Sequence, residues 1–82
     1  MAEIIYFDGF GNAWTGIRSE TIDVQATVTI EGMEIRYAGT FAQVSPGMPF
    51  WYENSCGLVE IAVNHGNARD VLGIDIGSKV NL

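Results

Sequence analysis

Turn-forming residues recur along this chain at intervals of about eight to twelve positions, which leaves room only for short elements between them. Ten glycines and two prolines supply most of these breaks. A chain of 82 residues can build one modest core and is too short for two domains. The pattern therefore predicts a single all-β domain over residues 1–82, a small Greek-key barrel or sandwich of about six or seven short strands.

The segments between the turns carry strand patterns. Residues 2–7 (AEIIYF) are rich in β-branched and aromatic side chains, and from Ile22 to Ile30 apolar residues alternate with polar ones, which predicts a long strand. Glu31-Gly32 forms a two-residue turn into a strand from Met33 to Tyr37, giving a hairpin. Further strands are expected at 40–44, 50–52, 58–63 and 79–82.

One short helix is expected near the C-terminus. Asn67 is suited to cap its first turn, because its side chain can accept a hydrogen bond from a free backbone N–H group. The helix would run through Leu72 and end at Gly73, a residue that adopts the left-handed conformation of a helix end without strain.

Composition excludes several classes of function. Ten acidic against four basic residues give a net charge of −6, scattered along the chain, and this repels phosphate backbones, so we expect no nucleic acid partner. No stretch approaches the roughly 20 apolar residues of a membrane span, and no signal peptide pattern appears, so we expect no membrane partner. Cys56 is the only cysteine, which fits a reducing compartment and predicts a cytoplasmic location.

Hydrolytic chemistry has little support in the residues. His65 is the only histidine, and no strained serine elbow precedes it. Cys56 would need the same histidine as its base, and small cysteines more often pack than react. The acidic residues show no metal-ligand spacing, so the sequence predicts no metal site and no catalytic residue.

Two short stretches offer groups that suit a flat, uncharged heterocycle. An asparagine amide donates and accepts at once, aromatic faces stack, and glycines let backbone approach closely. Phe10, Asn12 and Asn64 are the candidates. The same residues also serve ordinary turns and cores, so both interpretations stay open on chemistry alone.

Two longer segments, read together, resemble a known family. "YFDGFGNAWTGI" (6–17) and "ENSCGLVEIAVNHGNARDVLGIDIGSKVNL" (53–82) are similar, in order, to motifs of the C-terminal domain of the S-adenosylmethionine hydroxide adenosyltransferases, which are related to the fluorinating and chlorinating enzymes. In that family the chemistry takes place between a larger N-terminal domain and the C-terminal barrel of a neighbouring subunit in a trimer. The C-terminal side supplies mainly recognition.

The resemblance implies an adenine site made from both segments. Asn12 would hydrogen-bond the edge of the ring, with Phe10 and Phe41 close to its plane. The backbone around Asn64 and His65 would complete these contacts. The expected ligand is S-adenosylmethionine or adenosine, with no separate cofactor.

The resemblance also implies a site for the methionine part of the ligand. Asp8 and Ser55 would lie where the family holds the amino and carboxylate groups. Cys56 stands where the halogenating members place an arginine, which removes a charge-assisted hydrogen bond to the carboxylate. Gly9 also departs from the family, which commonly has arginine at this position.

The N-terminal domain that activates water in the family has no counterpart in these 82 residues. We therefore expect an adenosyl-recognition domain that binds rather than catalyses by itself, although full-length relatives are hydrolases that form adenosine and methionine. One alternative is an oligomerisation or interaction module without a ligand, which exposed rings at Trp14, Phe50, Trp51 and Tyr52 would favour. Others are a partner in trans of a separate N-terminal domain and a residual hydrolase.

Overall fold

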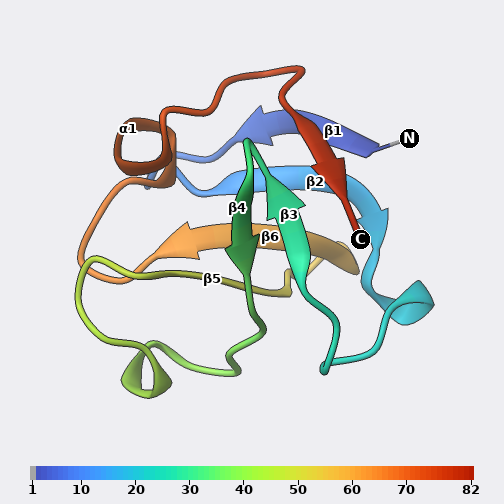
Figure 1. The fold of residues 1–82 in the computed structure, drawn as a ribbon, viewed down its shortest axis with the longest axis horizontal. Helices are drawn as coiled ribbons and strands as arrows, with labels where there is room; N and C mark the ends of the chain where they lie inside the picture. The colour runs from blue at the N-terminus through green and yellow to red at the C-terminus, as the bar shows by residue number, and fades with distance from the viewer. Residues whose placement is uncertain (1) are drawn as a thin grey trace.

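The computed structural model describes residues 2–82, with the side chain of Phe41 outside the description. Within this range the chain forms seven short strands and one α-helix, with the two termini on the same side of the molecule in Figure 1. The strands are β1 (Ala2–Phe7), β2 (Ala13–Arg18), β3 (Val28–Ile30), β4 (Met33–Ile35), β5 (Pro49–Glu53), β6 (Leu58–Val63) and β7 (Lys79–Asn81). The helix α1 spans Ala68–Leu72, and 3₁₀ turns span Ser19–Thr21 (η1) and Phe41–Gln43 (η2).

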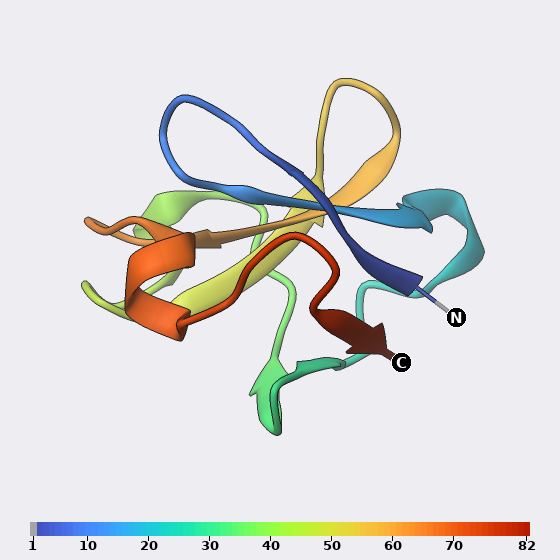
Figure 2. The same ribbon diagram turned by 90° about the horizontal axis from the view of Figure 1, so that it is seen from above.

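The strands form one antiparallel sheet in the order β4-β3-β7-β1-β2-β6-β5, and its two ends meet. The N–H group of Trp51 on β5 donates to the carbonyl of Arg36 at 3.0 Å, and the N–H group of Ala38 donates back to Trp51 at 3.1 Å. The hairpin β3–β4 lies in front of β2 and β6 in Figure 1, and Figure 2 shows that it forms the opposite wall. The predicted small all-β barrel with one short helix is confirmed.

The interior of the barrel is filled by aliphatic side chains and one tryptophan. On β6, Val59 and Ile61 are fully buried and face the core. Trp51 is 2% exposed, and its indole N–H donates to the carbonyl of Ala26 at 3.1 Å. The core cluster comprises Ile4, Ala13, Ile17, Val28, Ile30, Ile35, Trp51, Val59, Ile61, Ile74 and Val80.

The four aromatic rings that were expected to be exposed are buried or half-buried in the single chain. Phe50 is 3% exposed and Trp51 is 2% exposed, while Trp14 and Tyr52 are half-buried. Their burial was underestimated because Trp51 faces the barrel core, while Phe50 on the opposite face of β5 packs with Ala38 and Ala62 in a second cluster. These rings therefore do not form the open aromatic surface on which the interaction-module hypothesis depended.

The predicted hairpin and the predicted helix are both present. β3 and β4 pair in register, and the turn residues Glu31 and Gly32 have φ values of 50° and 77°, as a two-residue hairpin requires. The side chain of Asn67 accepts from the N–H group of Asp70 at 3.2 Å, and Gly73 ends the helix with φ at 65°. Local chemistry thus fixes both elements.

The long strand expected from Ile22 to Ile30 is wrong except for Val28–Ile30. The carboxylate of Asp23 accepts from the N–H group of Gln25 at 2.8 Å, and the Asp23 carbonyl accepts from Ala26 at 2.9 Å, which turns the chain. Ile22 and Ala26 still pack against the core, so their alternation reflects burial from a loop. The strand expected to reach Tyr37 ends at Ile35, where the chain leaves β3 to meet β5.

The strand expected at 40–44 is also wrong, because this segment contains η2. The side-chain oxygen of Gln43 accepts from the N–H groups of Gly39 at 2.7 Å and Thr40 at 3.3 Å, which closes the turn locally. Conversely, β2 was not predicted, because Gly16 weakens its strand pattern. Pairing with β1 on one side and β6 on the other stabilises it.

Candidate functional site

The turn between β1 and β2 is organised by one carboxylate. Oδ1 of Asp8 accepts from the N–H groups of Phe10 and Asn12, each at 2.9 Å. The backbone closes the same turn, since the N–H group of Asp8 donates to the Asn12 carbonyl at 3.1 Å. Asp8 therefore holds the segment that presents Phe10 and Asn12.

This turn rests on the start of α1. Gly11 is buried with φ at 78°, and its carbonyl accepts from the N–H group of Arg69 at 3.3 Å. The guanidinium of Arg69 also lies 4.8 Å from the centre of the Phe7 ring at the end of β1. The helix, although short, thus fixes the position of the β1–β2 turn.

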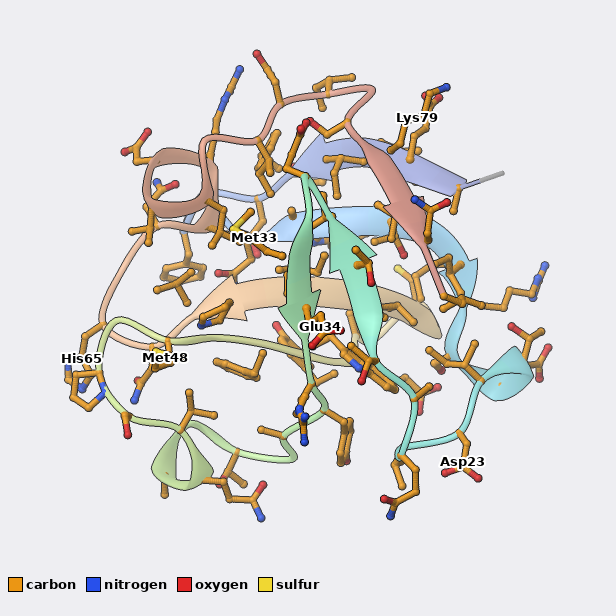
Figure 3. All side chains as sticks on the ribbon, in the orientation of Figure 1. Asp23, Met33, Glu34, Met48, His65 and Lys79 are labelled. Atoms are coloured by element: carbon orange, nitrogen blue, oxygen red, sulfur yellow. The ribbon has the colours of Figure 1, made fainter. Side chains whose placement is uncertain are left out.

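A pocket of about 500 Å³ opens between this turn and the end of β6. It is lined by Asp8, Phe10, Asn12, Tyr52, Val63, His65 and Gly66. Phe10 is 82% exposed at its rim. Figure 3 shows His65 at the edge of the molecule, beside the loop that carries Met48. The structure therefore brings together four predicted site residues from two distant segments.

The walls of the pocket are apolar, aromatic and amide groups with one acidic residue. Among the residues that line it, Asp8 carries the single carboxylate, and none is lysine or arginine. Its oxygen Oδ1 is held by the turn, while Oδ2 is not used in those two hydrogen bonds. The arrangement suits a neutral or positively charged ligand and disfavours a phosphate.

Tyr52 lines one wall of the pocket and was not predicted as a site residue from the sequence. Its hydroxyl donates to Oε2 of Glu60. Burial, together with the hydrogen bond to Glu60 and its negative charge, raises the pKa of Tyr52 above that of a free tyrosine, and a side-chain hydrogen bond with Asn12 acts in the opposite direction. Tyr52 therefore stays neutral at physiological pH and acts as a hydrogen-bonding ring rather than as a base.

The alternation of β5 was the signal that could have found Tyr52. Trp51 points into the core, so the next side chain must face outward, toward the surface that also carries the β1–β2 turn. Val63 was missed for a different reason, since a valine at the end of a buried strand looks the same whether it lines a pocket or a core.

Asn64 lies next to the pocket and holds a loop. Its side-chain amide donates to the carbonyl of Val44 at 2.6 Å, and its own N–H group donates to Met48 at 3.1 Å. Its carbonyl accepts from Gly47 at 2.7 Å. Asn64 is 7% exposed and is not among the lining residues, whereas Phe41, expected near the ring, lies outside the described side chains.

Of the three residues expected at the methionine part, Asp8 lines the pocket, and the other two lie in the turn between β5 and β6. Ser55 and Cys56 are both exposed, at the end of β6 opposite Val63, and are not among the lining residues. Oδ1 of Asn54 shapes this turn by accepting from the N–H groups of Cys56 at 2.9 Å and Leu58 at 3.0 Å. Figure 2 shows this turn and the β1–β2 turn rising from the same side of the barrel.

Within residues 2–82, no group of three or more His, Cys, Asp or Glu side chains is placed to hold a metal ion. In the same range, no helix combines the length and apolar character that crossing a bilayer requires.

The comparison with protein families covers nearly the whole chain. Residues 2–81 match the model of the SAM hydroxide adenosyltransferase C-terminal domain. The chain belongs to this family. It is 39% identical over 80 residues to an (R)-S-adenosyl-L-methionine hydrolase of Thermus thermophilus, and 29% identical over 82 residues to a protein of the same name from Salinispora tropica. These matches cover 98% and 99% of this chain but 31% of each relative.

Two solved structures contain the same barrel within longer chains. A conserved hypothetical protein of Thermus thermophilus superposes with a TM-score of 0.89 at 40% identity, covering 99% of this chain and 34% of that one. An uncharacterised conserved protein of Thermotoga maritima superposes with a TM-score of 0.79 at 28% identity, covering 98% and 35%. The SAM hydroxide adenosyltransferase C-terminal domain thus spans about a third of the length of the relatives it matches.

Proposed function

We propose that this chain is an adenosyl-recognition domain that binds the adenosyl part of S-adenosylmethionine in the pocket between the β1–β2 turn and the end of β6. One observation carries the proposal. Asp8, Phe10 and Asn12 from the first family segment and His65 from the second line the same pocket. The named relatives of this chain are S-adenosyl-L-methionine hydrolases, which supports the choice of ligand.

The chemistry of the walls suits that ligand. The Asn12 amide can donate to and accept from the edge of an adenine ring, and the exposed face of Phe10 is free to stack on it. The Asp8 carboxylate favours a positive charge, which a sulfonium or an ammonium group supplies. The volume of about 500 Å³ falls within the range of about 300–1,000 Å³ that small-molecule sites occupy.

The pocket is proposed to be one wall of a larger site. Phe10 projects with 82% of its surface exposed, so a ligand stacked on it would remain open to solvent on its other side. We propose that a second polypeptide covers it, either an N-terminal domain of this family or another copy of the chain. Binding would then belong to this domain, and hydrolysis of S-adenosylmethionine would require the second wall.

Calorimetric titration of the chain with S-adenosylmethionine and with adenosine tests the proposal. Asn12→Ala should weaken both ligands by about tenfold, because the edge of the adenine loses a paired donor and acceptor. Asn81→Ala is the matched control, since Asn81 is exposed on β7, away from the pocket, and its affinity should equal that of the unaltered chain. The proposal fails if neither ligand gives heat at about millimolar concentration.

A further inference from the structure

Glu60 is a buried carboxylate outside the barrel core. It lies on β6 between Val59 and Ile61, which face inward, so its side chain faces outward. Its cross-strand neighbours are Trp14 on β2 and Tyr52 on β5, and between them Glu60 is only 3% exposed. A carboxylate this far from water is costly unless each oxygen has a hydrogen-bond partner.

Both oxygens of Glu60 have such a partner, and the two partners belong to different parts of the site. Oε2 accepts from the hydroxyl of Tyr52, whose ring lines the pocket. Oε1 accepts from Nδ2 of Asn54 at 3.2 Å. The other end of the Asn54 side chain organises the turn that carries Ser55 and Cys56. One carboxylate therefore connects the pocket wall to the β5–β6 turn.

We propose that Glu60 is a positioning residue that sets the β5–β6 turn relative to the Tyr52 wall of the pocket, so that a ligand longer than adenosine meets both. This inference rests on the proposed function for its ligand. Adenosine would contact the pocket alone. S-Adenosylmethionine carries a tail that extends from the pocket, and Figure 2 places the turn on the same side of the barrel as the β1–β2 turn.

The two oxygens of the Glu60 carboxylate make both links charge-assisted hydrogen bonds, the stronger kind. Tyr52 and Asn54 both present donors to Glu60, one to each oxygen. A glutamine at position 60 would keep one neutral acceptor, and its NH₂ group could meet the Tyr52 hydroxyl only by reversing that hydrogen bond, so at least one charge-assisted link is replaced by a weaker neutral one. Glu60→Gln therefore weakens the connection while it keeps the size of the side chain.

The first experiment needs no ligand. In Glu60→Gln, backbone N–H groups of Cys56 and Leu58 should exchange with deuterium about tenfold faster, because Asn54 loses its charged anchor. Ultraviolet titration should show one tyrosine ionising at lower pH, because Glu60 contributes to the raised pKa of Tyr52 after burial. Glu34→Gln, at an exposed position on β4, is the control and should change neither readout.

The second experiment measures ligand selectivity. Glu60→Gln should lower the affinity for S-adenosylmethionine by at least about tenfold and that for adenosine by less. Asn54→Ala removes the link to Glu60 and the two side-chain hydrogen bonds that shape the turn, and leaves the Tyr52–Glu60 hydrogen bond in place. It should reproduce this split and so covers the case in which Glu60→Gln fails to fold. Equal losses for both ligands in the folded variants would overturn the inference, as would unchanged exchange and tyrosine ionisation. If the unaltered chain binds neither ligand, the proposed function fails. Hydrogen exchange and tyrosine titration would still test whether Glu60 connects the β5–β6 turn to Tyr52.

Discussion

A Cβ atom at Gly11 would lie 2.1 Å from Cγ of Asn67. The residue that caps α1 therefore occupies the space that a side chain in the β1–β2 turn would need. Gly11 also has φ at 78°, a conformation that other residues adopt only with strain. The glycine of the Phe10-Gly11-Asn12 motif thus serves the close packing of turn on helix, and through it the placement of Asn12 at the pocket.

Gly11→Ala should destabilise the chain strongly. Left-handed backbone strain costs about 1–3 kcal/mol and overpacking about as much again, so we expect a loss of about 2–6 kcal/mol in the free energy of unfolding. Urea denaturation followed by tryptophan fluorescence measures it. Gly9→Ala is the matched control, because nothing lies within 4 Å of a Cβ there, and its stability should be nearly unchanged. Equal stability of the two variants would contradict this account of Gly11.

Asn67→Ala should cost about 1 kcal/mol, because the N–H group of Asp70 loses the side-chain oxygen that caps the helix. Asn67→Asp keeps an acceptor in the same place and should lose much less. Thermal and urea unfolding of the two variants give the comparison. A similar loss in both would mean that the NH₂ group of Asn67, rather than the capping oxygen, is what the side chain contributes.

Trp51→Phe should cost about 2–4 kcal/mol, since it leaves a cavity and removes the indole donor to the Ala26 carbonyl. The loss should also loosen residues 22–27, which that hydrogen bond attaches to the barrel. Hydrogen exchange across this loop checks the second effect. Protection of the loop equal to that of the unaltered chain would show that Ile22 and Ala26 hold it without Trp51.

The raised pKa of Tyr52 gives a pH dependence with a defined sign. Since the hydroxyl ionises more readily in the unfolded chain, its contribution to stability is complete below about pH 10 and is lost as the pH rises further toward the folded-state pKa. The free energy of unfolding should therefore fall at alkaline pH, and less steeply in Tyr52→Phe. Denaturation curves measured from about pH 8 upward test this, and parallel slopes for the two proteins would contradict it.

Local signals in the sequence predicted the elements that local chemistry determines. The Glu31-Gly32 turn and the Asn67 cap both depend on residues a few positions apart, and both are present. The alternation from Ile22 misled because Asp23 forms a turn with its own neighbours while the apolar residues still reach the core. Burial and strand pairing produce the same alternation, and only the register of the partner distinguishes them.

The candidate site was predictable where the family motifs are continuous. Asp8, Phe10, Asn12 and His65 lie around one pocket, as the two segments suggested. Tyr52 was not predicted, because its role depends on which face of β5 the closed barrel turns outward. The part played by Glu60 likewise depends on Trp14 and Tyr52 meeting it from two different strands. Cross-strand neighbours of this kind cannot be read from spacing along one chain.

The meeting of β5 with the segment after β4 has a consequence for self-association. A sheet that stays open presents free N–H and carbonyl groups on its end strands, on which another chain can add a strand. Here the backbone of Trp51 donates to Arg36 and accepts from Ala38, so at this seam the chain uses those groups on itself. The partner proposed above for the Phe10 side of the pocket would therefore gain nothing from these backbone groups and would depend more on side chains, whose identity can change without any change to the barrel.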